Sequence, residues 1–252
     1  QQFLDSAFSA EEQLLKKVLD HVRTQKGKQV RPVFTLLCAK LCAAPNNKTI
    51  NVAAAYELLH TASLIHDDVV DNTMERRGQP SANALFDNRT AVLVGDYILA
   101  RNMDIGLRSG QYDLLTHIIG SMATLCEGEI LQSDHANKLD ISKEAYFDII
   151  YKKTAALFGS CASAGALSVG ANRKTVESMN KFGEMVGMAF QIVDDILDYT
   201  PNNNTGKPAA NDLQERKITL PLLEVLEQVT EAERTEIISA VERAATDKEA
   251  VE

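Results

Sequence analysis

The sequence predicts an all-α protein, and three observations carry this prediction. Apolar residues recur at helical spacing through most of the 252 residues, and 45% of all residues are hydrophobic. Glycine and proline are few, with 13 and 6 copies, so long helices are rarely interrupted. Period-two strand patterns and Asn-Gly hairpin signals are absent from the sequence. No linker divides the chain, so we expect a single domain over residues 1–252.

The apolar pattern places the helices in a regular succession along the chain. The first is expected to begin at Ser9, a candidate N-cap with Glu12 three residues later. Pro32 suits the first turn of the second helix, because proline fits that position without losing a hydrogen bond. The expected helices cover 9–24, 32–43, 49–71, 90–108, 111–134, 142–170, 174–200, 219–228 and 231–245.

Two polar segments, 72–89 and 200–216, are expected to be loops, since both are rich in turn-forming residues. Small residues dominate the apolar stretch 158–166. They predict either close approach of neighbouring helices or room for a cavity between them.

A D-D-x-x-D pattern ends one apolar helix and recurs late in another. Asp67 and Asp71 stand four residues apart and share a helix face, as do Asp194 and Asp198. Two carboxylates about 6 Å apart repel by roughly 3 kcal/mol at an effective dielectric constant near 20. One such motif alone is commonly a solvated helix end. Two copies in the same apolar context indicate two walls of one polyvalent cation site.

The expected cation is hard and prefers oxygen ligands. Carboxylates without accompanying cysteine or paired histidine suit Mg²⁺, with Mn²⁺ as a substitute. Mg²⁺ binds one or two carboxylates and completes its shell with water and phosphate oxygens. The motifs therefore predict a phosphorylated substrate.

Basic residues lie beside the acidic helices or interrupt apolar ones. Lys28 and Arg31 flank a helix start, where backbone N–H groups favour anions. Arginine side chains match phosphate oxygens with two parallel donors. Singly, each is more often a surface charge, but together they indicate phosphate binding. The set is Lys28, Arg31, Arg76, Arg77, Lys152, Lys153, Lys207 and Lys217, with His60 on nearly the same helix face as Asp67.

Composition narrows the remaining classes. A net charge of −9 argues against nucleic-acid binding. The four cysteines lie in apolar contexts without C-x-x-C spacing, so buried free thiols in a reducing compartment, the cytoplasm, are expected. No signal peptide opens the sequence, and no run of 18 uncharged apolar residues predicts a membrane span.

Several motifs occur in the order found in one enzyme family. They are Gly27-Lys-x-x-Arg31, Asp67-Asp-x-x-Asp-x-x-x-x-Arg-Arg-Gly78, Lys153-Thr154, Phe190-Gln-x-x-Asp-Asp-x-x-Asp198, Gly206-Lys207 and Lys217-x-Thr-Leu-Pro221. With them, nearly the whole chain resembles trans-isoprenyl diphosphate synthases, the polyprenyl synthetases. The stretches 60–68 and 81–86 look most like the long-chain branch, such as octaprenyl diphosphate synthases. The resemblance implies antiparallel helices around a central cavity, a homodimer, and a C-terminal part of the family fold outside this sequence.

The resemblance also assigns roles to individual residues. It implies that Asp67, Asp71 and Asp194 hold the metal and that Asp68, Asp195 and Asp198 support it. The same six aspartates and Lys153 form the implied catalytic set. Isopentenyl diphosphate would be bound by Lys28, Arg31, His60 and Arg77. The allylic diphosphate would be bound by Arg76, Lys153, Thr154, Gln191 and Lys207. The chain departs from the family at Ala210 and Arg216, where glycine is usual.

The implied reaction is Mg²⁺-dependent head-to-tail addition of isopentenyl diphosphate to an allylic diphosphate such as farnesyl diphosphate. The product would be a long all-trans polyprenyl diphosphate of octaprenyl length, whose lipidic character favours membrane proximity. Ala62 and Ser63 lie roughly 6 to 8 Å below Asp67 at 1.5 Å per residue. In shorter-product relatives bulky aromatics near these positions close the product channel, and here both residues are small.

Other functions remain open at this point. A farnesyl or geranylgeranyl diphosphate synthase would share every motif. A class I terpene cyclase needs only one diphosphate site, which leaves the second basic group without a role. His66-Asp67 could belong to an HD-type metal phosphohydrolase, but that reaction needs further histidine ligands and does not use Asp194. A non-enzymatic regulatory subunit is expected to have lost an acidic motif, and both are intact.

Overall fold

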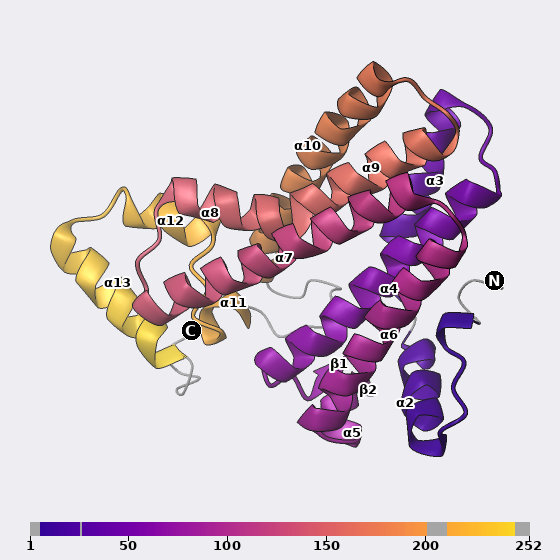
Figure 1. Cartoon of the computed structure of the whole chain (residues 1–252). Coiled ribbons are helices and arrows are strands. Elements are labelled where there is room, and N and C mark those ends of the chain that lie inside the picture. Colours follow the sequence, from indigo (N-terminus) through magenta and orange to yellow (C-terminus); the bar gives the residue numbers. More distant parts are fainter. Residues whose placement is uncertain (1–5, 26, 201–210, 245–252) are drawn as a thin grey trace. The chain divides into compact units, whose positions relative to one another are not determined.

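The computed structural model describes residues 6–25, 27–200 and 211–244, and in this part the chain is almost wholly helical (Figure 1). The all-α prediction is therefore confirmed. The chain forms two compact units. Unit 1 comprises Gln1–Met122 and Phe158–Gly183, and unit 2 comprises Ala123–Leu157 and Glu184–Glu252.

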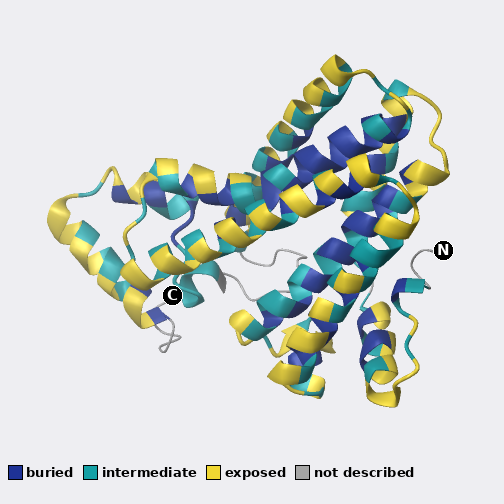
Figure 2. Ribbon diagram, viewed as in Figure 1, coloured by how far each residue is buried: buried dark blue, intermediate teal, exposed yellow. Residues whose placement is uncertain are grey.

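Unit 1 is built around α4, which packs along α6 and against α3. Its elements are α2 (Gln13–Thr24), α3 (Val30–Cys42), α4 (Asn47–Val70), β1 (Glu75–Arg76), β2 (Gln79–Pro80), α5 (Ala82–Leu85), α6 (Asn88–Arg108), the start of α7 (Tyr112–Lys138), most of α9 (Ala156–Ser168) and the start of α10 (Arg173–Asp198). Asn46 and Thr49 form a reciprocal capping box that fixes where α4 begins. Many residues of α4 and α9 are buried (Figure 2).

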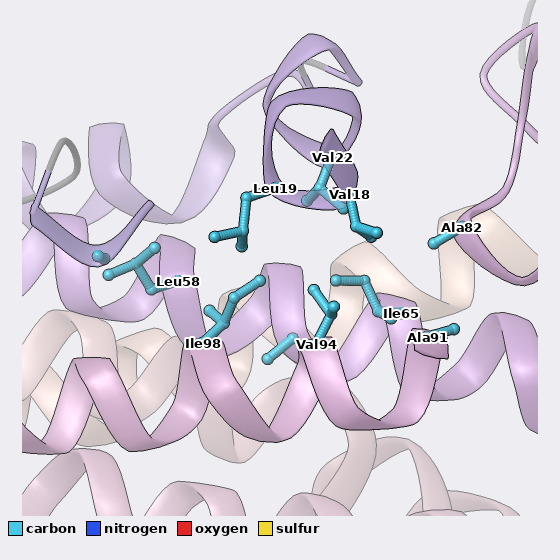
Figure 3. Close-up of a cluster of buried hydrophobic side chains, with 11 residues drawn as sticks. Val18, Leu19, Val22, Leu58, Ile65, Ala82, Ala91, Val94 and Ile98 are labelled. Carbon is cyan, nitrogen blue, oxygen red and sulfur yellow. The ribbon is translucent and has the colours of Figure 1, made fainter. Parts of the chain in front are cut away.

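The core of unit 1 holds the C-terminal half of α4 in place. Figure 3 shows α2 lying across α4 and α6, with apolar side chains from all three helices turned toward one another. The cluster contains Ala7, Val18, Leu19, Val22, Leu58, Ala62, Ile65, Ala82, Ala91, Val94 and Ile98. Fully burying one valine, leucine or isoleucine contributes about 1.5–3 kcal/mol. This core therefore sets the direction in which α4 presents its terminal aspartates.

Two glycines let backbones approach closely in unit 1. A Cβ on Gly165 would lie 2.5 Å from the carbonyl oxygen of Thr35, so α9 touches α3. A Cβ on Gly183 would lie 2.5 Å from the carbonyl oxygen of Phe158. No side chain can occupy either position without moving a backbone. The close packing predicted from the small residues of 158–166 is confirmed at Gly165.

Unit 2 packs shorter helices around a second core. Its elements are the end of α7, α8 (Lys143–Ile150), the π-helix η1 (Tyr151–Ala155), the end of α10, α11 (Asn211–Gln214), α12 (Leu220–Leu226) and α13 (Glu231–Ala244). The buried core residues are Tyr146, Ile150, Ile218, Leu223, Leu226 and Val241. This core holds α8, and with it the adjoining η1, in a fixed position within unit 2.

The predicted N-cap of the first helix is wrong. The helix begins at Gln13, and the carboxylate of Glu12 caps it by accepting the N–H groups of Leu14 and Leu15 at 3.1 and 2.6 Å. A carboxylate is a stronger acceptor than a hydroxyl and also meets the positive end of the helix dipole. The competing acceptor three residues downstream therefore prevails over Ser9.

The segment 72–89 is more ordered than a loop. Residues 75–80 form a two-stranded antiparallel hairpin in which Glu75 pairs with Pro80 and Arg76 with Gln79. Its turn residues Arg77 and Gly78 have φ of 55° and 73°, as a type I′ turn requires. The Asn-Gly signal is absent because arginine occupies a position that asparagine usually takes.

All four cysteines lie in the described part, and none is joined in a disulfide. Cys38 and Cys161 are buried as expected, whereas Cys126 is exposed. By length and composition α7 could cross a membrane, although the sequence analysis identified no such stretch. In its most apolar 18-residue window, 28% of the residues are buried. The core helix of a soluble protein passes the same test, so this indication is weak.

Candidate active site

The first acidic motif forms the C-terminal end of α4. Asp67 is half-buried, and Asp71 is the exposed C-cap whose N–H donates to the Asp67 carbonyl at 2.8 Å. Their carboxylates lie at the negative end of the helix dipole, which adds to their mutual repulsion. A bound cation would relieve both effects.

The middle aspartate of this motif has a different environment. Asp68 is 3% exposed, and its Oδ1 accepts hydrogen bonds from Nε and Nη2 of Arg76 at 2.7 and 2.6 Å. Burial raises the pKa of Asp68, and the hydrogen bond from Arg76 opposes that rise. The resemblance implied metal support for Asp68 and diphosphate binding for Arg76, but here the two side chains bind each other.

Cationic groups surround His60 on α4. Burial holds the pKa of His60 well below its ordinary value, and the charges of Arg31, Arg77 and Arg76 lower it further. His60 is therefore a neutral group among arginines. The half-buried Glu57, one turn earlier, has its pKa raised by burial and lowered by Arg31 and Arg77. The sequence analysis did not single out Glu57, although its i, i+3 spacing to His60 was visible.

Arg31 and Arg77 are each held by local contacts. The guanidinium carbon of Arg31 lies 5.5 Å from the ring centroid of Phe158, a cation–π contact. Nη1 of Arg77 donates to the Gln25 carbonyl at 2.9 Å. A Cβ on Gly27 would lie 2.6 Å from the Arg77 guanidinium, so this glycine makes room for it. Lys28 is exposed on the adjoining stretch.

The second acidic motif, on α10 in unit 2, repeats the arrangement of the first. Asp194 is exposed, and Asp198 is half-buried and accepts the N–H of Asp212 at 3.0 Å. Asp195 is 4% exposed and accepts hydrogen bonds from Tyr146 Oη at 2.6 Å and Gln191 Nε2 at 2.8 Å. Burial raises the pKa of Asp212 to about 7, and the charges of Asp198 and Asp195 contribute.

In both motifs, therefore, the second aspartate is buried against a fixed partner. The implied metal ligands Asp67, Asp71 and Asp194 are the less buried positions, and they offer only carboxylate oxygens, a donor set that fits a hard divalent cation. Within the described ranges no group of three or more His, Cys, Asp or Glu side chains is arranged to hold a metal ion. Each motif alone supplies too few ligands.

Lys153 lies in η1, a widened turn of a kind often found at functional sites. Its ammonium group is 2.8 Å from Oε2 of Glu129 on α7 and also donates to Oε1 of Gln132. A Cβ on Gly128 would lie 2.9 Å from the backbone nitrogen of Lys153, so this glycine lets α7 and η1 approach. The sequence analysis missed Glu129 and Gln132, whose signal was two polar residues following Gly128 in an apolar helix.

Other implied residues fall partly outside the description. Lys207 and Ala210 lie outside the described residues. Lys217 forms an ion pair with Glu215, and Arg216 has φ of 59°, in the left-handed region that favours glycine. A glycine, which the family resemblance implies at this position, would adopt this backbone without strain, and this chain adopts it with arginine.

The two chain-length positions have different environments. Ala62 is fully buried in the α2–α4–α6 core, while Ser63 is half-buried and donates its hydroxyl to the His60 carbonyl at 3.0 Å. Tight packing against α6 is one sufficient reason for a small residue at Ala62.

The implied residues gather in two sets, one in each unit. Unit 1 brings together the acidic end of α4 and the basic residues of the hairpin and α3. Unit 2 brings together the second acidic motif, Lys153, Thr154 and Gln191. His66, the residue that an HD-type site would use, instead contacts the Val92 carbonyl at 3.2 Å and Asp96 at 3.4 Å.

Comparisons with known proteins agree with the motifs. The sequence matches the Polyprenyl synthetase family model over residues 12–252. The short chain isoprenyl diphosphate synthase of Methanothermobacter thermautotrophicus is 35% identical over 230 residues, 89% of this chain and 71% of that protein. The all-trans-nonaprenyl-diphosphate synthase (geranyl-diphosphate specific) of Rhodobacter capsulatus is 40% identical over 239 residues, 94% of this chain and 73% of that protein.

The fold agrees as well. The crystal structure of a decaprenyl diphosphate synthase from Rhodobacter capsulatus has a TM-score of 0.91 to this chain at 35% identity. The similarity covers 99% of this chain and 78% of that one. Of these three similar proteins, one is named a short chain synthase and two are named nonaprenyl and decaprenyl diphosphate synthases. The chain therefore belongs to the polyprenyl synthetase family, and it is a prenyltransferase.

Proposed function

We propose that this chain condenses isopentenyl diphosphate head-to-tail with an allylic diphosphate, such as farnesyl diphosphate, in the presence of Mg²⁺. The product is a long all-trans polyprenyl diphosphate of octaprenyl length, and the enzyme acts as a cytoplasmic homodimer. The terpene cyclase and phosphohydrolase alternatives lose their support with the family assignment and with the contacts of His66.

One observation carries the proposal. Each acidic motif buries its second aspartate against a partner, Arg76 for Asp68 and Tyr146 for Asp195. This pairing fixes the helix end and leaves the first and last aspartates of each motif as the ones suited to a cation. Two such motifs, each with cationic side chains in the same unit, match a reaction between two diphosphates.

The basic residues fit two different diphosphates. Arg31, Arg77 and the neutral His60 lie together in unit 1 and would hold isopentenyl diphosphate, with Lys28. Lys153 in unit 2 would hold the allylic diphosphate. Fixed guanidinium and ammonium groups neutralise charge without reorganising, which is the main contribution such a site makes to the rate.

Asp67, Asp71 and Asp194 would hold Mg²⁺ or, in its place, Mn²⁺. When bound, the cation supplies positive charge to the departing diphosphate. The allylic C–O bond breaks and its electron pair leaves with the diphosphate. The double bond of isopentenyl diphosphate then forms the new C–C bond, and loss of one proton restores an alkene. The released diphosphate is a suitable proton acceptor.

The test is prenyl transfer from farnesyl diphosphate with labelled isopentenyl diphosphate and Mg²⁺. Asp67→Ala and Asp194→Ala should abolish turnover while circular dichroism stays unchanged. Asp134→Ala is the matched control, because this exposed aspartate pairs with Lys138 one turn away on the same helix. A near-wild-type rate in either motif variant would refute the metal assignment. Product formed without isopentenyl diphosphate would support a cyclase instead.

The assignment of the two diphosphates has its own test. Arg31→Ala should raise the KM for isopentenyl diphosphate and change the KM for the allylic substrate little. The reverse pattern would mean that the two sites are exchanged.

A further inference from the structure

The buried aspartate of the second motif is the centre of a chain of hydrogen bonds. Asp195 Oδ2 accepts from Tyr146 Oη at 2.6 Å, and Asp195 Oδ1 accepts from Gln191 Nε2 at 2.8 Å. Gln191 Oε1 in turn accepts from Thr154 Oγ1 at 2.7 Å. The four residues come from α8, η1 and α10, all within unit 2.

The direction of every bond in this chain follows from one group. Both carboxylate oxygens of Asp195 are acceptors in these bonds, so Gln191 turns its amide nitrogen toward Asp195. Its carbonyl oxygen then faces Thr154, whose single hydroxyl hydrogen is used in that bond. Thr154 therefore has no hydrogen left for a phosphate oxygen. The second N–H of Gln191 is not used in the chain.

Tyr146 is well suited to hold this arrangement. Its side chain is 2% exposed and belongs to the core of unit 2. Burial and the hydrogen bond to Asp195 raise the pKa of Tyr146, so the phenol keeps its proton and remains a donor. The carboxylate is thereby held at the oxygen that Gln191 does not bind, by a ring that is buried in the core.

We propose that Tyr146 and Asp195 are positioning residues that orient Gln191 as an N–H donor to the allylic diphosphate, with Thr154 acting through Gln191. This inference rests on the proposed function. It changes the role of Thr154, which the family resemblance places directly on the diphosphate. It also gives Tyr146, a core residue, a part in substrate binding.

The decisive variant is Tyr146→Phe, which keeps the packed ring and removes one hydroxyl. The KM for farnesyl diphosphate should rise about tenfold, which corresponds to about 1.4 kcal/mol. The KM for isopentenyl diphosphate should stay within about twofold, because that site lies elsewhere. Tyr151→Phe is the matched control: Tyr151 Oη also donates to a carboxylate of α10, Glu184, at 3.0 Å, but outside the chain. An unchanged KM in Tyr146→Phe, even with lowered stability, would show that the hydroxyl only satisfies the core.

A double variant tests the part of Thr154. If Thr154 and Tyr146 both act through Gln191, Tyr146→Phe with Thr154→Val should raise the KM no more than the stronger single variant does. If the KM increases of the two single variants instead multiply in the double variant, Thr154 contacts the substrate directly and this part of the inference is overturned. Thr154→Ser should behave as wild type.

Calorimetric titration with farnesyl diphosphate gives the same comparison without turnover. If the wild-type protein binds farnesyl diphosphate but forms no C–C bond, the proposed function is refuted. The comparison of binding between wild type and Tyr146→Phe would still decide whether Tyr146 positions Gln191.

Discussion

Replacing Arg76 with methionine tests the ion pair that closes the first acidic motif. Methionine keeps much of the side-chain volume but cannot donate a hydrogen bond. The variant would leave the Asp68 carboxylate, whose side chain is 4% exposed, without the two donors at 2.6 and 2.7 Å. The carboxylate would then be a buried charge with its main partner removed.

The expected cost follows from this burial. Breaking a buried ion pair by removing one partner costs about 3–5 kcal/mol. The Arg76 side chain is 22% exposed, so water can reach part of the pair and the lower value of about 3 kcal/mol applies. With a urea m-value near 3 kcal/mol/M, the unfolding midpoint should fall by about 1 M.

The loss should also depend on pH. Burial holds the pKa of Asp68 above its ordinary value, so the folded state keeps a proton that the unfolded state releases. Such a carboxyl group favours folding most at low pH, and this contribution is lost as the pH rises through the folded-state pKa. Without Arg76, which lowers this pKa, the folded-state pKa of Asp68 rises further, so the contribution is lost over a wider pH range. The deficit of the variant should therefore be larger at pH 7 than at pH 4.

Urea unfolding followed by circular dichroism at both pH values is the assay. Arg108→Met is the matched control, since Arg108 pairs with Asp104 one turn away and is 79% exposed. Exposed pairs of this kind contribute about 0.5 kcal/mol or less. Equal midpoints for Arg76→Met and the control, or a deficit that shrinks toward pH 7, would refute the reasoning.

Three further outcomes are expected. Arg216→Gly should raise the urea midpoint, because a left-handed backbone costs a non-glycine residue about 1–2 kcal/mol. Glycine removes this strain, and the larger conformational entropy of its unfolded chain cancels only part of the gain. A lower midpoint would mean that the arginine side chain offsets the strain. Ser63→Tyr should shorten the prenyl product, as measured by chromatography, whereas Ala62→Tyr should overpack the core and cost about 1–3 kcal/mol of stability. An unchanged product length in Ser63→Tyr would show that the product channel does not run along this face of α4. Burial and three arginines hold the pKa of His60 low, so wild-type stability should fall as the pH drops below the pKa of an ordinary histidine. His60→Gln should reduce the difference in stability between pH 5 and pH 7, measured by urea unfolding.

The sequence predicted the features that depend on spacing along one helix. The all-α class, most helix positions and both acidic motifs followed from the 3.6-residue period. The burial of Asp68 and Asp195 also depends on spacing, since each lies about 100° around the helix from its neighbour. Their partners could not be predicted, because Tyr146 is 49 residues from Asp195 and the contact exists only after packing.

Other features depend on competition between local groups. Glu12 prevails over Ser9 as a helix cap because the stronger acceptor was also within reach. The hairpin was missed because Arg77 adopts a positive φ that sequence rules assign to asparagine or glycine. Glu129 and Gln132 stand out only as polar residues in an apolar helix, and their contact with Lys153 is what gives them a role.

The π-helix η1 has a consequence for insertions and deletions in this chain. Eight residues of regular α-helix would leave Tyr146 and Thr154 about 80° apart around the axis. A π-turn holds one more residue than an α-turn and rotates each residue less, which reduces this angle. Deleting one residue from 151–155 would yield an uninterrupted α-helix that still folds, yet it would turn Lys153 and Thr154 away from their partners. This helix is therefore a place where a gain in regularity would be a loss of function.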